Sequence, residues 1–142
     1  MTRLEELANM SVDSGSFLKF DNGYAFIIQV VDTDNIQEVE KAPFKDGGKV
    51  QTKYQWRVIL KEVKIMDATV VDYKRHMNPE KSAKIEGQPV NKVYTLELPK
   101  NATKKLSKYI LDQGITKTML LKFWRTGDKF DTKYTFMTEI QK

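Results

Sequence analysis

Aromatic and cationic side chains are interleaved in the stretch KFWRTGDKFDTKYTF, residues 122–136. A hydrophobic core uses the rings but has no need of the cations, and a solvated surface tolerates the cations but does not call for the rings. Single-stranded nucleic acid rewards both, because its bases stack on aromatic rings and its phosphates attract Lys and Arg. Residues 53–57 repeat this pairing of aromatic rings with cations, with Tyr54 and Trp56 beside Lys53 and Arg57. The predicted binding surface contains Lys53, Trp56, Arg57, Lys122, Trp124, Arg125, Lys129, Phe130, Lys133 and Tyr134.

Both tryptophans also fit a structural role. Trp56 alternates in phase with Val58 and Leu60, so it could share their apolar face. Trp124 could lie in the core or at its rim, with lysine stems extending past it into water. Alternation along the last hairpin favours a buried Phe123 and a Trp124 on the opposite face, which is the arrangement that nucleic-acid binding needs.

Residues for other chemistry are few. The chain has no cysteine, which excludes disulfides, thiolate metal sites and cysteine nucleophiles, and its one histidine, His76, excludes His-pair metal sites. Carboxylates gather at Asp32, Asp34, Glu38 and Glu40, but on a predicted loop without the glycine pattern of an EF-hand. No phosphate-loop, dinucleotide or nucleophile-elbow motif occurs. We predict no enzymatic activity, no metal and no cofactor.

Charge is distributed unevenly along the chain. Residues 1–48 hold 4 Lys or Arg and 9 Asp or Glu, a net charge of −5, whereas residues 49–142 hold 20 and 10, a net charge of +10. This polarity favours a polyanionic partner, although a lysine-rich composition alone would also produce it. No apolar run approaches the roughly 20 residues that span a bilayer. The first ten residues are too charged for a signal peptide, so we expect an intracellular (cytoplasmic) protein without membrane partners.

The first half of the chain predicts strands joined by long loops. Residues 16–31 predict a hairpin that turns at Asn22-Gly23, because this pair tolerates the positive φ of a tight turn. Residues 32–49 predict a long mobile loop. Residues 50–67 predict a strand, and residues 67–91 an irregular connection with a helical turn at most. One face of the 50–67 strand carries Tyr54, Trp56, Val58 and Leu60.

The second half predicts a strand over 92–99, a helix over 101–114, and two strands over 117–125 and 131–140 joined at Gly127-Asp128. Asn101 is the expected N-cap of the helix, and Gly114 follows its last turn. Antiparallel strands with one late helix favour a small closed barrel over a sandwich. At 142 residues the chain suits one domain.

Three segments resemble the OB-fold single-stranded-DNA-binding proteins of phages and related mobile elements. RTGDKFDTKYTF resembles their last hairpin, FLKFDNGYAFIIQVV their opening hairpin and KYQWRVIL their third strand. The resemblance implies a mainly β, OB-like antiparallel barrel over residues 16–142. The sequence before it, residues 1–15, predicts a short helix with Leu4 and Leu7 on one side, followed by a linker. The binding cleft that it implies is shaped or lined by Arg125, Lys129, Asp131, Thr132, Lys133 and Tyr134.

By resemblance, the protein coats single-stranded DNA during replication or recombination, in a phage-like or viral setting, and meets proteins of those processes. The chain departs from the family in lacking a zinc module and in ending TEIQK instead of an acidic, aromatic-tipped tail. Single-stranded RNA fits nearly as well, since rings and lysines do not read the 2′-hydroxyl. Two alternatives remain at this point: a structural or assembly barrel of a virus or mobile element that binds an acidic partner, and an enzyme that uses the 32–40 carboxylates.

Overall fold

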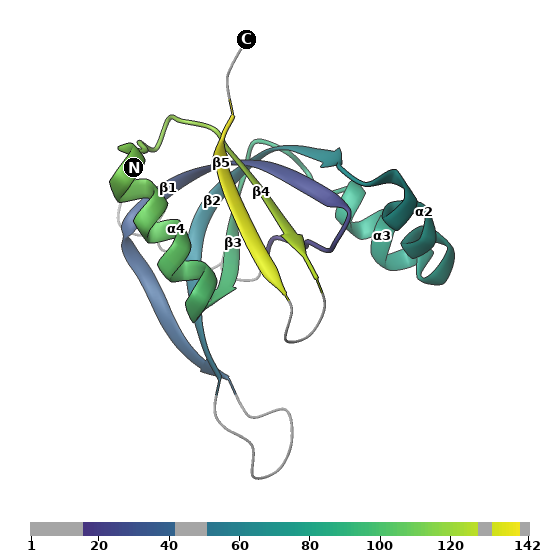
Figure 1. Ribbon diagram of the computed structural model, residues 1–142, viewed down its shortest axis with the longest axis horizontal. Helices are drawn as coiled ribbons and strands as arrows, with labels where there is room; N and C mark the ends of the chain where they lie inside the picture. The colour runs from purple at the N-terminus through teal and green to yellow at the C-terminus, as the bar shows by residue number, and fades with distance from the viewer. Residues whose placement is uncertain (1–15, 42–50, 128–131, 140–142) are drawn as a thin grey trace, which may run out of the picture.

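The computed structural model describes residues 16–41, 51–127 and 132–139. Five antiparallel strands form one sheet in the order β3-β2-β1-β4-β5, and three helices accompany it (Figure 1). The strands are β1 (Tyr24–Lys41), β2 (Gln51–Ile65), β3 (Lys92–Pro99), β4 (Leu121–Thr126) and β5 (Lys133–Thr138). The helices are α2 (Ala68–Met77), α3 (Pro79–Glu86) and α4 (Lys100–Gln113). The mainly β prediction is confirmed, whereas the helix and linker predicted for residues 1–15 lie outside the described residues.

The sheet curls around its own apolar face, and that face is the core (Figure 1). Alternate residues of β1 and β2 point inward, as period-two patterning requires. Trp56, Val58 and Leu60 are at most 1% exposed, and Tyr54 is partly buried against the same cluster. The predicted inner face of the 50–67 strand is therefore confirmed.

Hydrogen bonds do not close the sheet into a barrel within the described ranges, where β3 and β5 remain edge strands. The chain covers both edges in other ways. Residues 16–18 run beside β3, where the Leu18 amide donates to the Thr95 carbonyl at 2.8 Å. Helix α4 lies along β5, where Lys105 Nζ donates to the Tyr134 carbonyl at 2.8 Å and the Thr138 amide donates to Tyr109 Oη at 2.7 Å. Covered edges protect a sheet from pairing with other chains.

The predicted opening hairpin is wrong in its first arm. Asn22-Gly23 does form a turn, but residues 16–18 pair in parallel with β3 instead of antiparallel with β1. Gly23 has φ +94°, and a Cβ at this position would lie 2.9 Å from Val71 Cγ2 of α2. Glycine is therefore required both by the turn and by the close approach of α2.

The loop predicted for residues 32–49 is wrong over its first ten residues. β1 continues to Lys41 and pairs with the first part of β2, with Gln37 opposite Gln55 and Lys41 opposite Gln51. The register shifts between Val30 and Gln37, and β1 bends sharply midway along its length (Figure 1). Cross-strand pairing with β2 overrides the low strand propensity of the acidic and amide residues here. Residues 42–50 lie outside the described residues.

The irregular connection predicted for residues 67–91 is instead two helices, α2 and α3. Asp67 caps α2 by accepting a hydrogen bond from the Val70 amide at 3.2 Å. Asn78 ends α2 and caps α3, where it accepts from the Lys81 amide at 3.1 Å and precedes a proline suited to the first helical turn. Val71 and Ile85 anchor the two helices in the core.

The late helix is confirmed, with one correction at its start. Its N-cap is Pro99, and no side chain caps it, so the cap predicted for Asn101 is wrong. Gly114 ends it in the left-handed conformation at φ 62°, as predicted. Ala102 and Leu106 are buried on the face that meets the sheet.

Candidate nucleic-acid interface

The β4–β5 hairpin divides its residues between two faces. Phe123 is 0% exposed and packs its ring against Phe136 at a centroid distance of 5.3 Å, and against Phe20 at 5.2 Å. Trp124 is partly exposed on the opposite face, beside Ala25 of β1 and Thr135 of β5. The face assignment predicted from alternation is confirmed.

Trp124 carries a cation against its ring. Lys122 Nζ lies 5.5 Å from the ring centroid, within cation–π range. Ala25, the neighbour of Trp124 on β1, is fully buried, and Lys64 continues this row on β2. Lys64 also forms an ion pair with Glu139 at 3.4 Å. A flat ring, the Lys122 ammonium group and solvent therefore meet on the outer face of β4, whereas the Lys64 ammonium group is held by Glu139.

Arg125 and Tyr134 occupy the inner face, on the same side as Phe123. They are cross-strand partners at the end of the hairpin. The Tyr134 ring is stacked almost parallel to Phe123, with centroids 6.2 Å apart and planes 4° apart, and it meets Phe20 edge-on. Burial raises the pKa of the Tyr134 hydroxyl, an effect that the nearby Arg125 charge partly offsets. Tyr134 thus packs at the edge of the core and does not lie on the outer face that carries Trp124.

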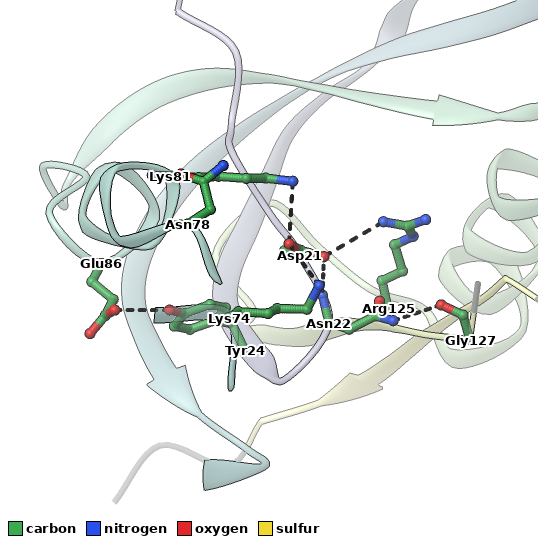
Figure 2. A network of polar contacts seen from close by, with 9 residues as sticks. All are labelled: Asp21, Asn22, Tyr24, Lys74, Asn78, Lys81, Glu86, Arg125 and Gly127. Atoms are coloured by element: carbon green, nitrogen blue, oxygen red, sulfur yellow. Dashed lines mark hydrogen bonds and ion pairs between the residues drawn. The ribbon is translucent and has the colours of Figure 1, made fainter. Parts of the chain in front are cut away.

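Arg125 points toward Asp21, the centre of a polar network (Figure 2). The Asp21 carboxylate is 7% exposed and lies 3.1 Å from Lys74 Nζ, 3.3 Å from Lys81 Nζ and 3.9 Å from Arg125 Nη1. Burial opposes ionisation of this carboxyl, but the Asn22 amide and the two lysines outweigh it and hold its pKa below the usual range. The network ties α2, α3 and β4 to the turn before β1.

Trp56 requires a correction. Its ring is 1% exposed, and its Nε1 donates to Thr103 Oγ1 of α4 at 3.2 Å, so it belongs to the core and offers no face to a base. Lys53 and Arg57 lie on the opposite face of β2 and are partly exposed, with Arg57 opposite Asp32. Lys53 pairs with Val39 of β1 and Lys122 with Ile27, positions that lie on either side of the bend in β1. The predicted cations follow the sheet as a dispersed series and do not form one cluster.

The other residues of the predicted binding surface and cleft lie in the sequence at or near the β4–β5 turn. Lys133 is exposed at the start of β5, and Thr132 before it is partly buried. Lys129, Phe130 and Asp131 lie outside the described residues.

The carboxylates of residues 32–40 lie on β1. Asp32 accepts hydrogen bonds from Asn35 Nδ2 at 2.9 Å and from the Asp34 amide at 3.1 Å. The Asn35 hydrogen bond is the largest influence on the pKa of Asp32, and it lowers that pKa. His76 is exposed on α2. Across residues 16–41, 51–127 and 132–139, no three carboxylate or imidazole groups gather closely enough to hold a metal ion.

A second basic surface was not predicted. Two hollows, of about 520 and 370 Å³, flank residues 16–20 and share Lys19 and Lys84 in their linings. The sequence signal was available in Asn78-Pro79, which starts α3 and so presents Lys81 and Lys84 on a helix.

No helix in the parts of the chain that the structure describes is long and apolar enough to cross a membrane. Comparison with protein-family models, curated proteins and solved structures found no match.

Proposed function

We propose that this protein coats single-stranded DNA without sequence preference. The observation that carries the proposal is the pairing of Lys122 with the partly exposed ring of Trp124 on the side of β4 opposite Phe123. A base stacked on such a ring gains about 1–3 kcal/mol, and any of the four bases can do so. The Lys122 ammonium group, which contacts this ring in the free protein, would move aside for the base and pair with a phosphate of the same strand.

The order of the elements supports an OB-like arrangement. β1, β2 and β3 form a meander, α4 follows β3, and the β4–β5 hairpin returns beside β1. OB folds are five-stranded, partly open barrels that bind oligonucleotides on the face of the second and third strands and with the β1–β2 and β4–β5 loops. Lys53 and Arg57 lie on the second strand of this sheet, and Arg125 and Lys133 lie on either side of its β4–β5 turn.

Tryptophan fluorescence provides a direct test, because the two tryptophans differ in accessibility. Trp56 is enclosed in the core and serves as an internal reference, whereas Trp124 is partly exposed. Single-stranded DNA should quench only the Trp124 component, and Trp124→Phe should abolish the quenching. Neutralising about three phosphates predicts a tenfold to twentyfold loss of affinity between about 50 and 200 mM salt. Equal affinity for duplex DNA, or affinity independent of salt, would overturn the proposal.

The same titration separates the competing interpretations. Polyglutamate of matched charge should bind more weakly than single-stranded DNA, because a carboxylate chain has no flat ring to stack on Trp124. Equal affinity would favour an assembly protein that binds an acidic partner. Single-stranded RNA tests whether the surface distinguishes the two sugars. Labelled strands should remain intact with magnesium, and cleavage that Asp34→Ala abolishes would establish an enzyme instead.

A further inference from the structure

Residues 16–20 form a ridge between two hollows on the side of the molecule that carries α3. The larger hollow lies between Leu18, Phe20 and the face of α3 that carries Lys81 and Lys84. The smaller one lies on the other side of the ridge and reaches Lys92 and Tyr94 of β3. Their volumes, about 520 and 370 Å³, are in the range of pockets that accommodate small organic molecules.

The linings of the two hollows are strongly basic. Four lysines and one glutamate, Glu80, are their charged residues. Glu80 lies 3.6 Å from Lys84 in an exposed pair one helical turn apart, which offsets little of the positive charge. Lys19 is exposed and forms no ion pair with any other residue that the structure describes. Two of the lysines, Lys19 and Lys84, border both hollows.

Apolar and aromatic surface accompanies these lysines. Leu18 and Ile85 are buried at the base of the larger hollow, and Phe20 forms part of its wall. On the other side of the ridge, Phe17 is 39% exposed. Rings beside lysines are the combination that favours single-stranded nucleic acid at the hairpin, and here they occur in a concave setting.

The larger hollow also adjoins the hairpin, but on its inner face, so a strand stacked on Trp124 would reach the hollow by passing around the end of β4 at Arg125. The Phe20 ring meets Tyr134 edge-on at a centroid distance of 6.2 Å. Lys81 and Arg125 share the Asp21 carboxylate, so a series of cations leads from α3 to the end of β4 (Figure 2).

The ridge is fixed in place by reciprocal hydrogen bonds. The Lys19 amide donates to Gln88 Oε1 at 2.7 Å, and Gln88 Nε2 donates to the Lys19 carbonyl at 2.8 Å. Gln88 itself is 8% exposed. A preformed backbone reduces the conformational entropy that binding would otherwise cost.

We infer that the two hollows hold further nucleotides of the strand bound at the hairpin. Phosphates lie beside Lys19 and Lys84, and a base packs in the larger hollow against Phe20. This inference rests on the proposed single-strand binding and extends its footprint from β4–β5 across Asp21 to α3 and β3. It assigns α3, which lies between β2 and β3 in the chain, to the ligand path.

The test compares two double variants that remove the same charge. Lys19→Ala with Lys84→Ala, called the ridge variant, removes the two lysines that border both hollows. Lys104→Ala with Lys108→Ala removes exposed lysines of α4 that form no ion pair with other described residues. Binding is measured for oligonucleotides of about 4 to 16 nucleotides, the range of site sizes for one OB fold. The wild type should gain affinity as the strand becomes long enough to enter the hollows. The ridge variant should lose that gain, and its slope of log affinity against log salt should be smaller in magnitude by about 1.4.

Each outcome separates the inference from the proposal on which it rests. If the ridge and α4 variants behave alike at every length, the hollows do not bind the strand, even while Trp124 quenching still supports the hairpin. If Trp124→Ala binds normally and the ridge variant does not, the hollows bind and the hairpin proposal fails. If the wild type binds no single strand, both fail.

Discussion

Replacing Phe123 and Trp124 one at a time should separate folding from binding, because the two residues are adjacent on β4 and face opposite sides. Phe123 is 0% exposed, and its ring contacts four other aromatic rings at centroid distances of 5.2 to 6.2 Å. Phe123→Ala should therefore cost about 4–5 kcal/mol of unfolding free energy, near the upper end for aromatic truncations in cores. A domain of this size should then melt roughly 12 °C or more below the wild type.

Trp124→Ala removes a ring that is only partly buried, so its cost in unfolding free energy should be about 1 kcal/mol. Its effect on binding should be larger. Loss of one stacking platform costs about 1–3 kcal/mol, a decrease of roughly 5- to 150-fold in affinity for single-stranded DNA of any sequence. Trp124→Phe keeps a ring at the position and should retain most of the affinity.

The assay is a thermal melt beside an anisotropy titration of a labelled single strand, with both performed below the melting point of each variant. Under those conditions the folded fraction of Phe123→Ala should bind nearly as tightly as the wild type. The reasoning is refuted if Trp124→Ala melts far below the wild type, or if it binds with full affinity while folded. The first result would place the Trp124 ring in the core, and the second would remove it from the ligand path.

Three further substitutions test the surroundings of the site by denaturant or thermal unfolding. Asp21→Asn should cost about 1–3 kcal/mol at neutral pH. Folding lowers the pKa of the Asp21 carboxyl from 3.8, so the stability that the ionised carboxylate contributes is complete above pH 3.8 and is lost as the pH falls through the folded-state pKa. Equal profiles of stability against pH for the variant and the wild type would contradict this. Gly23→Ala should cost at least 1 kcal/mol, since φ is +94° and the added Cβ would lie 2.9 Å from Val71 Cγ2; an unchanged melt would show that α2 can shift. Thr103→Val leaves Trp56 Nε1 without its acceptor and should cost about 1–3 kcal/mol, with DNA affinity unchanged if Trp56 has no part in binding.

Period-two alternation was sufficient to predict the faces of β2 and β4 from the sequence. It placed Val58 and Leu60 on one side and separated Phe123 from Trp124, because burial on a curled sheet follows the pleat. Alternation did not determine the role of Trp56. The rings and lysines around it suggested binding, whereas its in-phase neighbours indicated the core, and α4 supplies the partner that settles the question.

Other features depend on contacts that no local pattern contains. Residues 32–41 look like a loop because their composition is polar, and they become a strand because β2 pairs with them. Asp21 gathers its cations from α2, α3 and β4, which are distant along the chain. The path of residues 16–18 along β3 is likewise a tertiary pairing, and the Asn-Gly turn that follows gives no sign of it.

The distal part of β1 has a consequence for how copies of the protein meet one another. β4 pairs with β1 only from Ala25 to Ile28, and within the described ranges no strand continues along that edge toward Lys41. An uncovered edge would template polymerisation by strand addition. Asp34, Glu38 and Glu40 are exposed along it, so two such edges repel each other at neutral pH. The acidic residues thereby oppose strand addition between copies of the protein, and high salt should weaken this repulsion.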